Sequence, residues 1–301
     1  MFGASSRYVP IAIGIKETEK ATRTDQTLED PKKENMICKT SDNLDLYYEI
    51  QGNIHSEQTI VFLNGLTQST LSWFFVQQAF KEKYKILLLD FIFQGQSEKE
   101  SEWRDFDQHA KDLKCVLEKE KILNPIFVGL SYGSLVAQHF AVLFPGTIKK
   151  LVLISSFAHS TPYFDAIGLS WSRSLEIGGY NLLLDVMLPN VLSENYFNNP
   201  LIPIEMMKEA RKGVNENTSA LMKLMRATKE RKDYRQELQK IITPTLIIHG
   251  EKDLLIPSHM AKEVHSNIKN SKYIIIKNAG HTLNLEGVPE VCAHITEFLE
   301  K

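Results

Sequence analysis

The sequence contains few cysteines and no long hydrophobic run. Its 301 residues include three cysteines, Cys38, Cys115 and Cys292, which are widely spaced and odd in number. This pattern argues against a disulfide framework or a zinc site and favours reduced, mostly buried thiols in a cytoplasmic protein. A membrane-spanning helix needs roughly 18 consecutive apolar residues. No segment provides them, so we expect no membrane span.

Strong charge of either sign is also missing, as are the common cofactor motifs. The formal net charge is -2 at pH 7, which gives no electrostatic reason to expect binding to nucleic acid or to an anionic membrane. The sequence has no P-loop, no G-x-G-x-x-G motif and no cluster of His or Cys ligands. We therefore expect no metal, no nucleotide cofactor and a small-molecule partner; the oligomeric state stays open.

The N-terminal segment differs from the rest of the chain. Its apolar run VPIAIGI is short, is broken by proline and glycine, and follows a single basic residue, which is not typical of a signal sequence. The polar residues after it lack periodicity, as in a flexible leader. We expect residues 1–35 to be a flexible extension and the folded domain to begin near Met36.

From there, short apolar runs alternate with helical patterns. This alternation predicts an α/β fold with a mostly parallel, eight-stranded sheet covered by helices on both faces. Helices are expected at about 69–81, 103–121 and 289–301, and after residue 131. The eight expected strands are 36–40, 44–50, 59–65, 84–90, 125–129, 149–156, 244–250 and 271–277.

One interval breaks this rhythm. About 85 residues separate the sixth and seventh strands, where a single crossover helix needs far fewer. Helical patterns at 166–188, 204–214 and 218–230 predict an inserted helical cap over 157–240, between core segments 36–156 and 241–301. The cap holds five of the eight methionines, which suit an adaptable apolar pocket but equally suit plain helix packing: Met187, Met206, Met207, Met222 and Met225.

The stretch GLSYG at 129–133 places Ser131 between two glycines, after a predicted strand and before a predicted helix. This context is typical of a nucleophile elbow, where a strained turn exposes the serine hydroxyl above the sheet. A polar residue in an ordinary turn is the simpler alternative. The strand, turn and helix together favour Ser131 as a nucleophile.

A serine nucleophile needs a base and an acid to orient that base. Asp253 and His281 each follow a predicted strand, and the order serine, acid, histidine is that of one known triad arrangement. Glu251 is an alternative acid. His139, inside a helix, and His249, at a strand end, are weaker alternatives for the base.

An acyl-transfer site also needs donors for the oxyanion. The backbone N–H of Tyr132, directly after the nucleophile, is one candidate. The backbone N–H of Leu66, in the loop at Asn64-Gly65, is the other. A plain turn is the alternative explanation for Asn64-Gly65.

Residues from about 36 to 301 resemble the α/β-hydrolase superfamily. The resemblance implies a serine hydrolase that cleaves an ester or thioester with an apolar acyl group through an acyl-enzyme. The chain departs from the family where it has Asn64-Gly65 in place of His-Gly and Phe93-Gln94 in place of Gly-His. The matching segments are NGL at 64–66, DFIFQGQS at 90–97, GLSYG at 129–133, HGEKD at 249–253 and AGH at 279–281.

Proteins with other activities share some of these sequence features. Residues 60–100 resemble the 3-hydroxyacyl acyl carrier protein acyltransferases of rhamnolipid biosynthesis, which implies transfer to a second hydroxyacyl chain and an acyl carrier protein or CoA thioester as partner. C–C bond hydrolases and perhydrolases share the triad, and a non-enzymatic ligand receptor can use the fold. The charged run at 229–235 is expected to be a solvated helix face; a site for an acidic carrier protein is the alternative.

Overall fold

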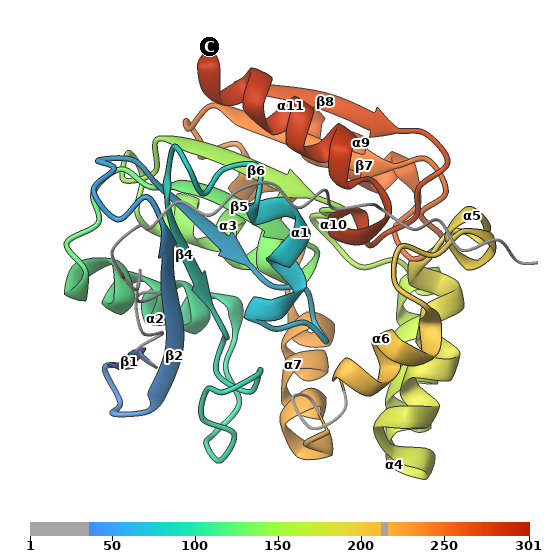
Figure 1. Cartoon of the computed structure of the whole chain (residues 1–301). Coiled ribbons are helices and arrows are strands. Elements are labelled where there is room, and N and C mark those ends of the chain that lie inside the picture. The colour runs from blue at the N-terminus through green and yellow to red at the C-terminus, as the bar shows by residue number, and fades with distance from the viewer. Residues whose placement is uncertain (1–35, 212–215) are drawn as a thin grey trace, which may run out of the picture. The chain divides into compact units, whose positions relative to one another are not determined.

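The computed structural model describes residues 36–211 and 216–301. They form one eight-stranded sheet in the order β1-β2-β4-β3-β5-β6-β7-β8 (Figure 1). Strands β3 to β8 are mutually parallel, whereas β2 pairs antiparallel with both β1 and β4. The strands are β1 Met36–Lys39, β2 Asp45–Gly52, β3 Thr59–Leu63, β4 Lys85–Leu89, β5 Ile126–Leu130, β6 Lys150–Ile154, β7 Thr245–Gly250 and β8 Ser271–Ile276. The predicted fold and all eight strands are confirmed.

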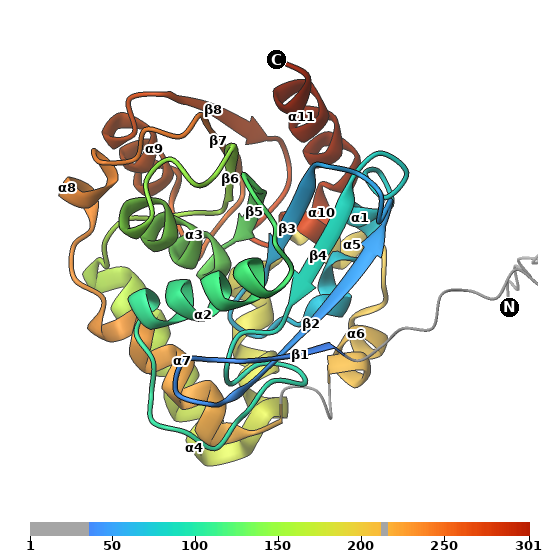
Figure 2. The ribbon, with the colours of Figure 1, turned by 90° about the vertical axis from the view of Figure 1, so that its left-hand side faces the viewer.

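Alternate residues of each central strand enter different cores, because successive side chains of a strand point to opposite faces. In β3, Val61 and Leu63 belong to one core, and Ile60 and Phe62 belong to the other. Helices therefore cover both faces of the sheet (Figure 2). One face carries α2 Phe106–Lys119, α3 Tyr132–Leu143 and α9 Ser258–Asn267; the other carries α1 Phe74–Gln77, α10 Leu283–Glu286 and α11 Val288–Glu300.

The interval between β6 and β7 is helical, as the sequence predicts. Helices α4 and α7 pack against each other, and with α6 they lie together at the bottom of Figure 1. The long helix α4 bends at Gly179, whose φ of 65° is not helical. The helices of this interval are α4 Pro162–Val191, α5 Glu194–Asn198, α6 Ile204–Arg211, α7 Thr218–Glu230 and α8 Arg235–Leu238. Among the described residues, no helix combines the length and apolar character needed to cross a membrane.

The helix expected over 69–81 is wrong in extent. The chain instead forms a 3-10 turn, η1 Thr70–Trp73, and the short α1. The buried residues Trp73, Val76 and Phe80 produce a helical pattern in the sequence. Hydrogen bonds from Ala79 to Val76 and from Phe80 to Gln77, however, tighten the chain into 3-10 turns before β4.

The helices expected at 103–121 and 289–301 correspond to α2 and α11. The expected N-terminal extension, 1–35, and the end of the pattern at 204–214 lie outside the described residues.

Candidate active site

Ser131 lies at a sharp turn between β5 and α3. Its φ of 49° and ψ of -114° are unusual for a residue with a side chain and place it in a strained conformation. Both flanking glycines are required by close packing. A Cβ on Gly133 would lie 2.2 Å from the Leu63 carbonyl oxygen, and a Cβ on Gly129 would lie 2.6 Å from the Gly133 carbonyl oxygen. The G-x-S-x-G pattern thus permits α3 to begin directly against the end of β3.

The loops after β7 and β8 bring Asp253 and His281 into contact. His281 Nδ1 lies 2.8 Å from Asp253 Oδ2, and both residues are buried. The other Asp253 oxygen, Oδ1, accepts hydrogen bonds from the backbone N–H groups of Leu255 and Ile256, at 3.0 and 2.8 Å. The carboxylate is therefore fixed from both sides. Glu251, by contrast, is exposed and accepts a hydrogen bond from the Asn278 N–H.

Two neighbouring elements hold the His281 backbone. Ser155, at the end of β6, donates its hydroxyl to the His281 carbonyl at 2.7 Å. The Val191 carbonyl, at the end of α4, accepts the N–H groups of His281 and Thr282 at 3.1 and 3.2 Å. Glu286 accepts from the N–H groups of Gly280 and Ser193 at 3.0 and 2.9 Å. The inserted helices are thus attached directly to the histidine loop.

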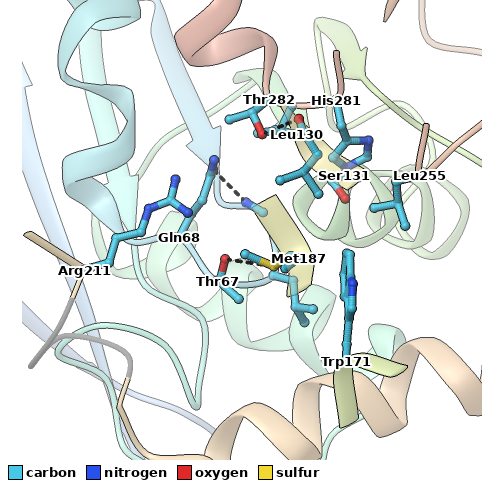
Figure 3. A pocket seen from close by; sticks show the side chains of 13 residues that line it. Thr67, Gln68, Leu130, Ser131, Trp171, Met187, Arg211, Leu255, His281 and Thr282 are labelled. Carbon is cyan, nitrogen blue, oxygen red and sulfur yellow. Dashed lines mark hydrogen bonds between the residues drawn. The ribbon is translucent and has the colours of Figure 1, made fainter. Parts of the chain in front are cut away.

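Ser131 and His281 line the same cavity, which has a volume of about 40 Å³ (Figure 3). Within the described part of the chain, His281 Nε2 is buried and has no hydrogen-bond partner. An imidazole held through one nitrogen by a carboxylate, with the other nitrogen free beside a serine, is able to accept and return a proton.

The two candidate oxyanion donors are also available. No described residue accepts a hydrogen bond from the N–H of Leu66 or of Tyr132. Tyr132 is the first residue of α3, where an N–H has no partner inside the helix. Leu66 lines the cavity beside Ser131. The close approach of Gly133 to Leu63 and Asn64 holds the two backbone segments together.

The loop that carries Leu66 is supported by residues that sequence reasoning did not assign to the site. Asn64 donates to the Leu89 carbonyl at 2.8 Å and accepts from the Trp73 indole at 3.0 Å. Gln94 donates to the carbonyls of Gly65 and Leu66 at 2.8 and 3.2 Å. In the sequence, the segment at 90–97 was the feature that could have indicated this network. In the structure, that segment supports the loop after β3.

Neither alternative histidine lines the cavity of Ser131, although His249 Nε2 lies 3.7 Å from Asp253 Oδ2. His139 Nδ1 lies 2.6 Å from Asp107, its Nε2 accepts from Arg231 at 3.1 Å, and its ring stacks on Tyr234. His249 is fully buried, with Nε2 2.9 Å from the Ile256 carbonyl. Burial lowers the pKa of His249, so this imidazole is neutral near pH 7.

The charged run at 229–235 is only partly a solvated face, which corrects the expectation from sequence. Helix α7 ends at Glu230, and Arg231 turns inward. Its guanidinium donates to His139 and to Gln138, the latter at 2.6 Å. Arg231 therefore ties the end of α7 to α3.

A larger cavity of about 880 Å³ lies between α4 and α7. It shares Leu66, Trp171 and Leu255 with the smaller cavity. Exposed charged residues, including Arg173 and Arg226, line its outer part. Its apolar wall consists of Leu66, Phe164, Leu169, Trp171, Met222, Met225 and Leu255.

The methionine prediction is therefore right for some residues only. Met222 and Met225 line the larger cavity, and Met187 lines the smaller one. Met206 is 63% exposed and Met207 is buried in the core. Neither Met206 nor Met207 lines either cavity.

Comparison with known proteins identifies similar chains. A family model for the alpha/beta hydrolase fold matches residues 58–288. The chain is 26% identical over 277 residues to the uncharacterized hydrolase YugF of Bacillus subtilis, covering 87% of this chain and 96% of that protein. It is 24% identical over 266 residues to the pimeloyl-[acyl-carrier protein] methyl ester esterase of Vibrio cholerae, covering 84% and 97%.

A solved structure gives a similar result. MGS-M2, an alpha/beta hydrolase enzyme from a Medee basin deep-sea metagenome library, superimposes with a TM-score of 0.80 and 30% identity, covering 88% of this chain and 98% of that one.

Proposed function

The chain belongs to the alpha/beta hydrolase fold family, and from this premise we propose that it is a serine hydrolase acting on an ester or thioester with an apolar acyl group. The observation that carries the proposal is the arrangement around His281. Its Nδ1 lies 2.8 Å from Asp253, and its Nε2 has no partner among the described residues. Ser131 lines the same cavity.

In the proposed mechanism, Ser131 Oγ attacks the acyl carbonyl while His281 Nε2 takes the hydroxyl proton. The oxyanion accepts hydrogen bonds from the N–H groups of Leu66 and Tyr132. His281 then protonates the leaving alcohol or thiol, which leaves an acyl-enzyme on Ser131. Water, deprotonated by His281, releases the acid. Asp253 keeps the imidazole in the required tautomer and stabilises its charged form.

The larger cavity supports an apolar acyl group. Its volume of about 880 Å³ lies in the range of about 300–1,000 Å³ that is usual for small-molecule sites. Its apolar wall reaches the smaller cavity through Leu66, Trp171 and Leu255. We place the acyl chain there, under a cap that spans residues 157–240.

The first test is covalent labelling with a fluorophosphonate probe, combined with hydrolysis of p-nitrophenyl esters. Ser131→Ala should abolish labelling and lower ester turnover by a factor of about 10³ or more, because the nucleophile is lost. Ser134→Ala is the matched control. Ser134 lies three residues after the motif's serine, but it is fully buried, and its hydroxyl donates to the Ser131 carbonyl at 2.6 Å and lies 2.8 Å from the Ser156 hydroxyl.

Peptide mass spectrometry of the wild-type adduct should locate the label on Ser131, and Ser134→Ala should still be labelled. Retention of most turnover by Ser131→Ala would contradict the proposal.

The alternative, acyl transfer by the same residues, predicts a different product. The Vibrio cholerae relative is named for an ester bound to acyl carrier protein, which supports testing a thioester substrate. A medium-chain 3-hydroxyacyl thioester should yield free acid if water attacks the acyl-enzyme. A coupled ester of two chains, detected by mass spectrometry and absent with Ser131→Ala, would indicate an acyltransferase instead.

A further inference from the structure

We propose that Arg211 forms an anion-binding subsite in the cavity of Ser131, and that the preferred substrate carries a carboxylate which pairs with this guanidinium. The inference rests on the proposed function, because it assigns a substrate class to the same cavity. It assigns a short acyl chain that ends in a carboxylate to the smaller cavity, beside the larger cavity proposed for a long apolar acyl chain.

Arg211 reaches the cavity from the insertion. It is the last residue of α6 and lines the smaller cavity together with Gln68 and Ser131. Figure 3 shows its guanidinium on the Gln68 side of the cavity, with Ser131 and His281 on the opposite side. A molecule that places a carbonyl at Ser131 can therefore extend another group toward Arg211.

Within the part of the chain that the structure describes, the guanidinium has no anionic partner of its own. Among the described residues, no carboxylate forms an ion pair with Arg211. The nearby titratable groups are the phenols of Tyr180 and Tyr196, and burial lowers the pKa of Arg211. The Tyr196 hydroxyl is already hydrogen-bonded to the backbone of Ile202, at 3.1 Å.

Lys208, one turn earlier on α6, provides the contrast. It forms ion pairs with Asp185 at 2.6 Å and Glu205 at 3.2 Å. A partly buried cation without a counter-ion is unfavourable, so an incoming anion gains more at Arg211 than at Lys208. A cation also stabilises the last turn of a helix. This role applies equally to Lys208 and Arg211, so it does not explain why Arg211, and not Lys208, points into the cavity.

The chemistry of Arg211 favours a carboxylate among the anions that could bind there. The planar guanidinium is suited to two parallel hydrogen bonds with the oxygens of that group.

The test compares matched substrates. One series consists of p-nitrophenyl monoesters of succinic, glutaric and adipic acid, each with a free carboxylate. The other consists of the neutral p-nitrophenyl butanoate, pentanoate and hexanoate. We expect the wild-type protein to favour at least one monoester over its neutral counterpart. Arg211→Gln should lower kcat/KM for that monoester at least about tenfold more than for the neutral ester, because a charge-assisted pair is lost.

Lys208→Gln is the control, since it removes a positive charge from the same helix turn. It should leave the preference for the monoester within twofold of wild type, and Arg211→Lys should retain part of the preference. If Arg211→Gln lowers both ester series equally, or leaves the preference intact, the subsite does not exist.

A binding measurement separates this inference from the proposed mechanism. Free glutarate and adipate are titrated by calorimetry into Ser131→Ala, alone or combined with Arg211→Gln or Lys208→Gln. At least one diacid should bind at least tenfold more weakly when Arg211 is replaced and unchanged when Lys208 is replaced. Equal binding by all three proteins would overturn the subsite. Rapid ester hydrolysis by Ser131→Ala would instead overturn the mechanism and leave the binding result valid.

Discussion

The side-chain amide of Gln94 joins the turn after β4 to the loop after β3. It donates to the Gly65 and Leu66 carbonyls at 2.8 and 3.2 Å, and it accepts from the Phe91 N–H at 3.3 Å. These bonds fix the peptide plane that contains the Leu66 N–H and the peptide plane that follows it. Gln94 is thus a positioning residue for the proposed oxyanion donor, and it occupies a place where members of the resembled family commonly have histidine.

Replacement of Gln94 should therefore affect kcat more than KM. We expect Gln94→Leu to lower kcat for a p-nitrophenyl ester about tenfold to a hundredfold, because a misplaced donor stabilises the transition state less well. KM should change less than threefold. The measurement is steady-state kinetics at a temperature where each variant is folded.

The control is Gln78→Leu, since Gln78 is exposed and its amide only donates to the Phe74 carbonyl. Gln94→His, which keeps an N–H donor, should recover part of the lost kcat. A Gln94→Leu protein that loses stability but keeps its kcat would show that the amide has a structural role alone.

Residues differ in how far the sequence reveals their place. Ser131, Asp253 and His281 could be predicted because each follows a strand, and the carboxyl ends of parallel strands meet at one edge of the sheet. Gln94 and Arg211 could not be placed in this way. Their relation to the cavity depends on how a turn and an inserted helix pack against the sheet, which local sequence patterns do not record.

At the scale of elements, the contact between α3 and β3 shapes the site. Gly133 permits the contact, because a Cβ there would lie 2.2 Å from the Leu63 carbonyl oxygen and 2.8 Å from that of Asn64. Both obstacles are backbone atoms that cannot rotate away. Gly133→Ala must therefore push the start of α3 away from the loop that holds Leu66.

We expect Gly133→Ala to reduce the free energy of unfolding by about 3 kcal/mol or more, the upper part of the range for overpacking. Chemical denaturation measures this change. Gly168→Ala is the comparison, since Gly168 lies within α4 and a Cβ there has no heavy atom within 4 Å. It should raise the free energy of unfolding by about 0.5–1 kcal/mol, the usual preference for alanine over glycine in a helix. Similar effects from the two substitutions would contradict this account of the elbow.

Contacts between elements also explain why the single helix expected over 69–81 does not form over its full length. Burial of Trp73, Val76 and Phe80 follows helical spacing, so periodicity predicts one continuous helix. The Thr70 N–H instead donates to Asp90 Oδ1 at 2.8 Å, which fixes the start of the segment to the turn after β4. The spacing of apolar residues shows which face of this segment is buried. It does not show the hydrogen bonds that divide the segment into shorter turns.

At the scale of the whole described fold, the inserted helices complete the site. The Val191 carbonyl, at the end of α4, holds the backbone of His281 and Thr282, and Ser193 shares the Glu286 carboxylate with Gly280. The insertion also supplies Trp171 and Met187 to the smaller cavity. Its length was evident from the sequence, whereas the cavity between α4 and α7 was not, because its volume depends on the packing of two helices far apart in the chain.

This cavity should set the length of the acyl chain. Met222 projects from α7 into its wall, whereas Met206, on α6, is 63% exposed and lines neither cavity. A larger side chain at residue 222 should remove space for about two methylene groups. Each buried methylene contributes about 0.8 kcal/mol, and 1.36 kcal/mol corresponds to a tenfold change in rate. Met222→Trp should therefore lower kcat/KM for octanoyl and decanoyl esters more than tenfold relative to acetyl and butanoyl esters.

Met206→Trp introduces the same side chain at an exposed position and should leave the chain-length profile unchanged. Rates measured across p-nitrophenyl esters from two to twelve carbons give the profile for each protein. If the profiles of Met222→Trp and wild type coincide, the acyl chain lies elsewhere. The cavity between α4 and α7 would then have to accommodate the leaving group, and the same variant should instead discriminate among acetyl esters of alcohols of increasing length.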